Sequence, residues 1–115
     1  MAHKKITLDN SEQFHWGKAG IGWMLSNSDK VTIVERQLSE GTREVKHYHN
    51  KSWQFFYVIS GVGTMFIDDD EIEISSDESV EVDPLCKHQF ANSGDGILRY
   101  LVISIPNSYG DRVEV

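Results

Sequence analysis

Two histidines separated by a single residue, His47 and His49, are the most chemically suggestive feature of this sequence. Residues i and i+2 of a β-strand point to the same face, so these two imidazoles would project together. Imidazoles placed in this way can bind one metal ion through their ring nitrogens. An imidazole with an ordinary pKa of about 6.5 can also serve as a general acid or base. The spacing therefore predicts either a metal site or an acid–base pair.

Gln54 is a candidate to join the two histidines. It lies five residues after His49, and this odd spacing would place it on the opposite face of one continuous strand. The segment 50–53 begins with Asn, Lys and Ser, which are suitable turn residues. We therefore expect the chain to turn there and enter a neighbouring strand, in which Gln54, Phe56 and Val58 face inward.

His88 is the third candidate imidazole. With Phe90 and Asn92 at positions i+2 and i+4 it forms one predicted inward-facing row. Cys86 stands two residues earlier, but Pro84 indicates a loop at that point. We therefore expect Cys86 to be a partly buried, inert thiol rather than a soft metal ligand.

The elements that must position these residues are short strands. No window sustains the spacing of an amphipathic helix for more than a turn or two, whereas short β-rich runs recur between Gly, Asn, Asp and Ser clusters. The acidic run 68–71 is expected to be a hairpin turn rather than a calcium loop. This pattern predicts an all-β sandwich or barrel. The predicted strands are Ile21–Leu25, Val31–Leu38, Trp53–Ser60, Val62–Ile67, Glu71–Ile74, Val80–Val82, His88–Phe90 and Ile97–Ile105.

Composition limits the class of protein. A length of 115 residues predicts a single domain over residues 1–115. Eleven basic and 18 acidic residues give a net charge of −7, which argues against nucleic acid or an anionic membrane as a partner. One cysteine excludes an internal disulfide and a Cys-rich metal framework. With no signal-peptide pattern and no apolar membrane span, the expected location is the cytoplasm.

The first histidine region resembles the first motif of the cupin family. That motif runs Gly, five residues, His-x-His, three or four residues, Glu, six residues, Gly. This sequence matches it at Gly41, His47, His49 and Gly61, and Gln54 stands in the glutamate position. The resemblance places the motif region at about residues 41–92 and extends over roughly Val31 to Ile105.

The second cupin motif, aligned on His88 and Asn92, is degenerate. Asp77, Asp83 and Leu85 replace the Gly, Pro and Gly of the family pattern.

The resemblance implies an all-β double-stranded β-helix, or jelly-roll barrel, that holds one divalent first-row metal ion (Fe, Mn, Ni, Cu or Zn). Carried over residue by residue, it makes His47, His49 and His88 the imidazole ligands and puts Gln54 in the carboxylate position. It further implies a small-molecule substrate, with oxygenase, decarboxylase or isomerase chemistry as the precedents. A homodimer is also expected, in which a segment such as Lys4–Leu8 of the short N-terminal arm, residues 1–15, pairs with the second subunit.

An amide oxygen brings no negative charge to a metal, so the role of Gln54 is open. The residue could bind the ion, lie beside the ligands, or mark a site without metal. Beside a metal-dependent enzyme, two other functions therefore remain open. A site without metal is similar to metal-free, RmlC-like sugar isomerases and epimerases, in which His47 and His49 would act as acid and base. A non-catalytic barrel that binds a small ligand is the third reading. If metal is bound, we expect its release below about pH 6, because only neutral imidazole binds metal.

The remaining candidates are assigned no role in the chemistry. Arg43 and Arg99 are expected to form surface ion pairs. Trp16, Trp23 and Trp53 are expected to be core or interface aromatics.

Overall fold

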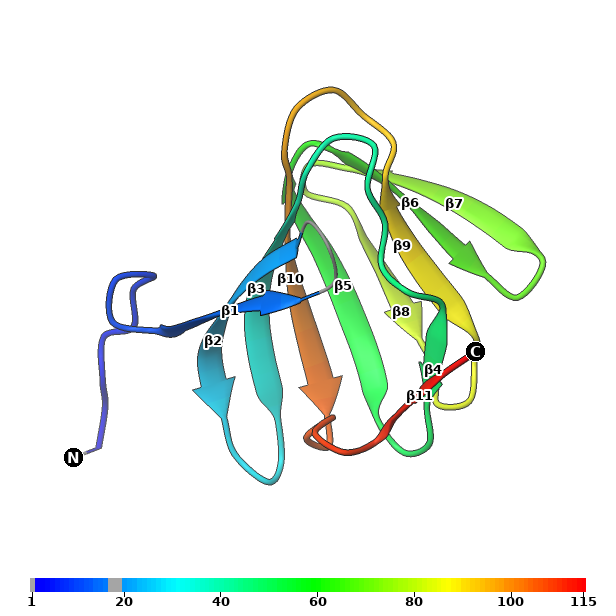
Figure 1. Cartoon of the computed structure of the whole chain (residues 1–115). Helices are drawn as coiled ribbons and strands as arrows, with labels where there is room; N and C mark the ends of the chain where they lie inside the picture. The colour runs from blue at the N-terminus through cyan, green and yellow to red at the C-terminus, as the bar shows by residue number, and fades with distance from the viewer. Residues whose placement is uncertain (1, 17–19) are drawn as a thin grey trace.

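The computed structural model describes residues 2–16 and 20–115, and within these ranges it contains β-strands and no helix. Two antiparallel sheets face each other as the two walls of a barrel (Figure 1). The expected all-β double-stranded β-helix is confirmed. One sheet has the order β1 (Glu12–Trp16), β2 (Gly20–Asn27), β3 (Thr32–Leu38), β10 (Leu98–Ile105), β5 (Trp53–Ser60), β8 (Ser79–Val82). The other has the order β11 (Arg112–Glu114), β4 (His47–His49), β9 (His88–Asn92), β6 (Val62–Ile67), β7 (Asp70–Ser75).

All eight predicted β-rich runs are strands, with ends that differ by a few residues at most. Three strands of the described residues lie outside these runs: β4, which the spacing of His47 and His49 anticipated, and the edge strands β1 and β11, which were not predicted. The apolar residues of β1 alternate with polar ones at only two positions, Phe14 and Trp16, which is a weak signal, and β11 is only three residues long. The described residues include no helix that could span a membrane.

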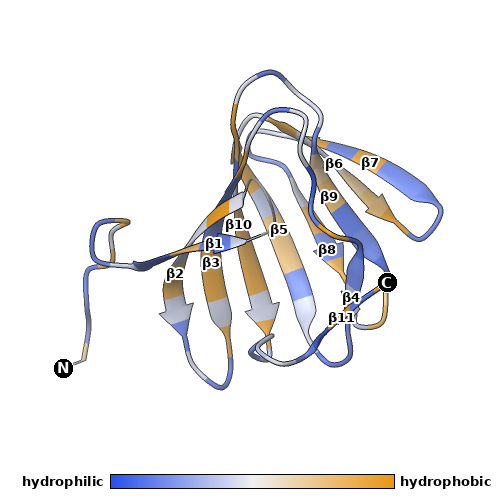
Figure 2. Cartoon of the chain, in the orientation of Figure 1, coloured by the Kyte–Doolittle hydropathy of each residue, from blue (hydrophilic) through white to orange (hydrophobic). Residues whose placement is uncertain are grey.

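The core lies between the sheets and is built from alternate residues of the strands. Along β10, for example, every second side chain from Leu98 to Ser104 is buried. Figure 2 shows hydrophobic residues along the central strands, whereas β4, much of β7 and most connecting loops are hydrophilic. Burying one such large apolar side chain stabilises the fold by about 1.5–3 kcal/mol. The core cluster consists of Leu38, Phe56, Val58, Met65, Ile74, Val82, Phe90, Leu98, Tyr100 and Val102.

The turn between β4 and β5 carries the chain from one sheet to the other. Asp111 holds this turn, because its carboxylate accepts hydrogen bonds from the backbone N–H groups of Lys51 and Ser52, both at 2.9 Å to Oδ2. The predicted change of strand before Gln54 is therefore correct, and the new strand lies in the facing sheet. Gln54 and the residues two and four places later are buried on the inner face, as expected.

Strand β1 closes one edge of the barrel by laying two aromatic rings over glycines. Phe14 lies opposite Gly22 in the strand register, and Trp16 lies opposite Gly20. A Cβ atom at either glycine would overlap the ring that covers it. These glycines therefore allow Phe14 and Trp16 to pack on the inner face of β2.

The degenerate second motif keeps an unusual backbone conformation. Asp77 and Leu85, which stand where the family pattern has glycine, have φ angles of 67° and 72°. Positive φ is unfavourable for side chains other than glycine, and more so for Leu than for Asp. These two turns therefore form here without glycine, the residue type that forms them most easily.

Candidate metal centre

Three histidines meet inside the barrel. His47 on β4 and His88 on β9 are directly opposite each other in the strand register, so they share the inner face. His49 follows two residues later on the same face. The three residues are 2%, 0% and 6% exposed, in the order His47, His88 and His49. One ring nitrogen from each lies within 4.8 Å of the others, a spacing at which the three could hold one metal ion.

Backbone carbonyls set the proton positions on two of these rings. His47 Nδ1 lies 2.7 Å from the carbonyl oxygen of Val45, and His88 Nδ1 lies 2.9 Å from that of Cys86. A carbonyl can only accept, so each Nδ1 carries the proton and donates it. Each Nε2 is then left with a free lone pair, which is the arrangement of a metal-binding imidazole. His88 Nε2 is buried and has no hydrogen-bond partner among residues 2–16 and 20–115.

The third ring is held differently. His49 Nδ1 is buried without a hydrogen-bond partner in the described part of the chain, and Asp111 Oδ2 lies 3.9 Å away. That separation is too long for a hydrogen bond. Burial by itself would raise the pKa of Asp111, but the hydrogen bonds from Lys51 and Ser52 outweigh it and hold this pKa below its usual value. Asp111 therefore places a negative charge close to His49.

Gln54 also brings an unsatisfied atom into the interior. Its amide nitrogen donates to Ser104 Oγ at 3.0 Å, which fixes the orientation of the amide. Its oxygen Oε1 is buried and has no hydrogen-bond partner among the residues described. Unsatisfied buried polar atoms are rare in native proteins. We therefore expect this oxygen to have a partner that interacts with its lone pair, such as a hydrogen-bond donor or a metal ion.

The histidines are neutral at physiological pH. Burial is the largest influence; it lowers the pKa of His47 to about 3 and that of His49 to about 4. Burial also lowers the pKa of His88. An ordinary imidazole would begin to lose a metal ion to protons below about pH 6. Because the pKa values of these histidines are lower, protons compete for their ring nitrogens only in more acidic solution. The nitrogen-rich, uncharged donor set fits a divalent first-row ion.

The sequence analysis missed a buried polar cluster beside the histidines. Glu44 Oε2 accepts hydrogen bonds from Arg36 Nη1 at 3.0 Å and from Tyr100 Oη at 3.2 Å, while Oε1 accepts one from the backbone N–H of Phe90 at 3.3 Å. Arg36 lies over the ring of Trp16, with 4.9 Å between the guanidinium carbon and the ring centre. The signal for it was the position of Arg36, two residues from both Val34 and Leu38, which puts it on the same face of a predicted strand as these apolar residues.

Of the two arginines that were expected to form surface ion pairs, the described contacts show one only for Arg99. Arg99 forms an ion pair with Glu35 at 2.9 Å, and Arg43 lies over the ring of Phe66. Cys86 is in the loop before β9, and burial raises the pKa of its thiol, so its reactivity is low.

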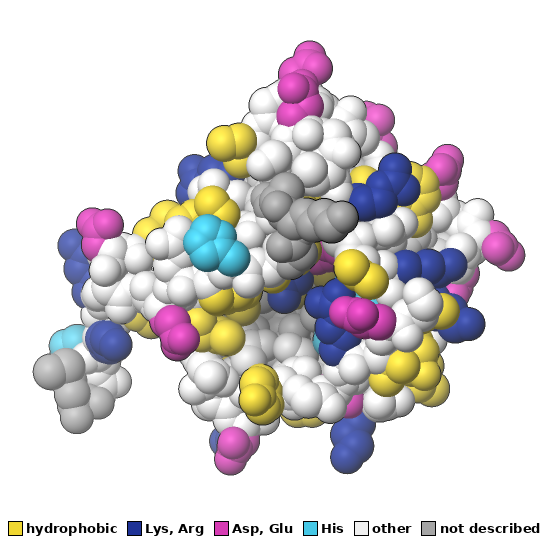
Figure 3. Space-filling model, in the orientation of Figure 1, with side chains coloured by type: hydrophobic (Ala, Val, Ile, Leu, Met, Phe, Trp, Pro, Cys, Tyr) yellow, Lys and Arg dark blue, Asp and Glu magenta, His cyan; other side chains and the backbone are white. Residues whose placement is uncertain are grey.

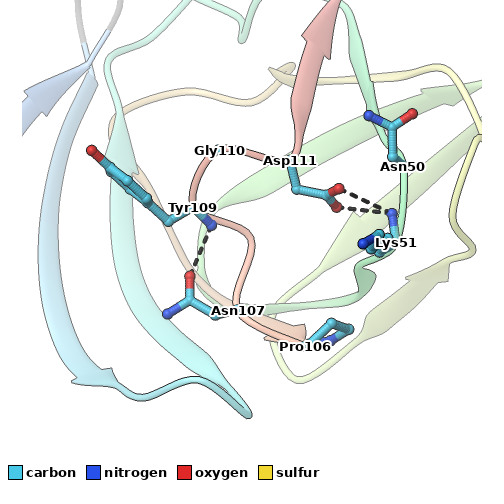
Figure 4. A pocket seen from close by; sticks show the side chains of 7 residues that line it. All are labelled: Asn50, Lys51, Pro106, Asn107, Tyr109, Gly110 and Asp111. Carbon is cyan, nitrogen blue, oxygen red and sulfur yellow. Dashed lines mark hydrogen bonds between the residues drawn. The ribbon is translucent and has the colours of Figure 1, made fainter.

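A pocket of about 460 Å³ adjoins the turn that supports His49. Figure 4 shows it between two loops, with the Asp111 carboxylate directed at the backbone of Lys51 and the Tyr109 ring pointing away. Tyr109 is 94% exposed, so its ring stands largely in solvent. The residues around the pocket are Asn50, Lys51, Pro106, Asn107, Tyr109, Gly110 and Asp111.

Solved structures share this fold over nearly the whole chain. A Streptomyces PAC13 variant with uridine is 19% identical, with a TM-score of 0.84 over 100% of this chain and 92% of that chain. The polyketide cyclase RemF from Streptomyces resistomycificus is 16% identical, with a TM-score of 0.83 over 98% and 85%. A predicted oxalate decarboxylase from Thermotoga maritima is 15% identical, with a TM-score of 0.83 over 90% and 99%. At these identities the likeness establishes the fold alone.

Sequence comparison establishes the family. The uncharacterized protein MJ1618 of Methanocaldococcus jannaschii is 26% identical over 77 residues. The match covers 67% of this chain and spans about 62% of the length of that relative. The family model described as "Cupin domain" matches residues 34–104, which include all three histidines and Gln54. The chain therefore belongs to the cupin domain family.

Proposed function

We propose that this cupin binds one divalent first-row metal ion through His47, His49 and His88, with Gln54 as a fourth ligand, and acts on a small organic molecule in the barrel. The observation that carries the proposal is the meeting of three buried, neutral imidazoles with ring nitrogens within 4.8 Å. The buried, unpartnered oxygen of Gln54 supports it.

The chain's own residues prepare the site for such a reaction. Ser104 orients the amide of Gln54, and two backbone carbonyls orient His47 and His88. Phe56 packs against the ring of His88, with 5.9 Å between the ring centres, and helps to exclude water. When bound, a divalent ion supplies a Lewis acid with open positions for substrate. Oxygenation, decarboxylation and isomerisation are the reaction classes that we propose, with Fe, Mn, Ni, Cu or Zn as the ion.

A metal-free isomerase or epimerase, in which His47 and His49 act as acid and base, is the second candidate, and the histidine tautomers support it as they support metal binding. A neutral imidazole with a free Nε2 can accept a proton as a general base, and His47 and His88 are both held in that form. Activity on sugar nucleotides that survives EDTA treatment would support this candidate over a metal enzyme. Saturable ligand binding without turnover under any metal condition would support a non-catalytic barrel.

Metal content tests the first proposal directly. Protein without a polyhistidine tag, dialysed without chelator, is expected to hold about one equivalent of a first-row ion by elemental mass spectrometry. His49→Ala is expected to lose the ion and remain folded. His15→Ala is the matched control, because His15 is exposed on β1 and lies outside the cluster. A stoichiometric ion in His49→Ala would contradict the proposal.

We also propose that the chain works as a homodimer, as small cupins commonly do. Light scattering coupled to size-exclusion chromatography tests this, and a mass of about one chain, 13.1 kDa, would contradict it.

A further inference from the structure

Two arginines begin on the inner face of the barrel, one from each sheet. Arg36 on β3 is directly opposite Tyr100, which is fully buried, and Arg112 on β11 is directly opposite His49. Directly opposite residues of antiparallel strands lie on the same face of a sheet. Both side chains therefore start from the surface that carries the histidines and the core.

Neither guanidinium has all its donors satisfied. The Nε atoms of Arg36 and Arg112 are both buried and have no hydrogen-bond partner among the described residues. Arg36 uses Nη1 for Glu44, and within the described part of the chain Arg112 has only a 3.8 Å ion pair with Glu114, whose side chain is 66% exposed. An ion pair that long and that exposed contributes little. The Nε edge of arginine is well suited to bind a carboxylate or phosphate through two parallel hydrogen bonds.

A third unsatisfied donor lies beside Arg36. The indole Nε1 of Trp16 is buried and unpartnered within the described ranges, and the Trp16 ring lies against the Arg36 guanidinium. An oxyanion at Arg36 would therefore have a second unsatisfied donor nearby.

The interior also contains two cationic side chains, Arg36 and Arg112, although the whole chain carries a net charge of −7. The three histidines are neutral, and both arginines are near enough to lower the pKa of His47 and of His88. Two nearby carboxylates balance this charge, and both already accept hydrogen bonds, Glu44 from Arg36 and Tyr100, and Asp111 from backbone N–H groups. Figure 3 shows basic side chains in and around a hollow on this face of the molecule.

We propose that the barrel selects a substrate with an organic oxyanion, a carboxylate or phosphate group, and that Arg36 and Arg112 are the residues that bind it. The inference deepens the proposed function, because it names the substrate class of the same site. An uncharged ligand set leaves the full +2 charge on a bound ion, and an anionic substrate would balance it. Anion binding by the two arginines itself needs no metal.

The three tryptophans allow a direct test in metal-free protein, prepared with EDTA and dialysed. Trp16 lies in the interior beside Arg36, whereas Trp23 and Trp53 alternate with inward-facing residues and so lie on the outer face. In ¹⁵N NMR spectra at pH 7 and constant ionic strength, acetate or methyl phosphate is expected to shift the indole resonance of Trp16 saturably. The resonances of Trp23 and Trp53 are expected to stay in place. Acetamide, a neutral analogue of acetate, is expected to have no effect. The probe with the lower Kd identifies carboxylate or phosphate as the preferred group.

Charge-neutral variants identify the binding residues. Arg36→Gln and Arg112→Gln are each expected to raise the Kd of the better probe at least about tenfold, whereas Arg99→Gln, on the outer face, is expected to leave it unchanged. Because Arg36→Gln strands the Glu44 carboxylate, the double variant Arg36→Gln/Glu44→Gln provides a neutral pair that preserves packing. An unchanged Kd in the Arg112→Gln and double variants, or an equal loss in Arg99→Gln, would overturn the inference.

A parallel zinc titration separates this inference from the proposed function. Zinc binding at one equivalent without an arginine-dependent anion response would overturn the anion site alone. An arginine-dependent anion response without zinc binding would support the anion site and count against the metal site.

Discussion

The backbone N–H of Leu85 donates a hydrogen bond to the carbonyl oxygen of His49 at 2.7 Å. Leu85 makes this contact from a left-handed conformation, with a φ of 72° and a side chain that is 64% exposed. A strained loop residue therefore anchors the backbone of one of the three clustered histidines. This connection explains why the chain keeps the turn even though leucine occupies the glycine position.

Leu85→Gly is expected to stabilise the protein. Glycine removes a left-handed penalty of about 1–2 kcal/mol and adds an entropic cost of about 0.5–1 kcal/mol in the unfolded chain. The expected gain in the free energy of unfolding is about 0.5–1 kcal/mol, measured by urea denaturation. Leu85→Ala is the control, because it shortens the side chain and keeps the penalty. If Leu85→Gly were less stable than Leu85→Ala, backbone strain at this position would not be the dominant effect.

The stability of the metal-free protein is expected to fall as the pH drops from about 6.5 toward 4. Over this range unfolded histidines bind protons, whereas folded His47 and His49 do not, because burial lowers their pKa values to about 3 and about 4. Between the pKa of the folded histidine and that of the unfolded histidine, each such residue lowers the free energy of unfolding by about 1.4 kcal/mol for every pH unit of acidification. Above the pKa of the unfolded histidine this loss is absent. Urea denaturation across this range measures it. His49→Gln should reduce the slope by the share of one histidine, and an unchanged slope would argue against a depressed pKa at His49.

Local sequence patterns predicted the positions of His47, His49 and Gln54, but they could not predict those of Arg112 and Glu44. His47 and His49 share a face because a strand has a period of two, and the turn residues after His49 indicated that Gln54 enters another strand. Arg112 belongs to the site through its register with His49, 63 positions earlier in the chain, and no local pattern encodes that pairing. Glu44 lies in irregular backbone, where neither the strand nor the helix period applies. Long-range strand pairing and loop conformation are therefore the parts that the sequence alone left undetermined.

Gln54→Glu is expected to tighten metal binding at least about tenfold, because a carboxylate adds a negative charge to an otherwise neutral donor set. The Ser104 hydroxyl that accepts from the amide can rotate to donate to the new carboxylate. Competition with a chromophoric chelator at pH 7 measures the change in affinity. The metal-free variant is expected to lose stability, because it buries an unpaired charge. Equal zinc affinity in the two proteins would place Gln54 outside the set of ligands.

Glu44→Gln is expected to destabilise the protein by about 3 kcal/mol, because it leaves the Arg36 guanidinium inside the barrel without its counter-charge. Tyr100→Phe removes only one hydrogen bond to the same carboxylate and should destabilise by about 1–2 kcal/mol. Urea denaturation measures both. The pair Arg36→Met/Glu44→Leu replaces the ion pair with apolar groups and is expected to recover much of the loss. If this double variant were as unstable as Glu44→Gln, loss of packing rather than an unpaired charge would explain the effect.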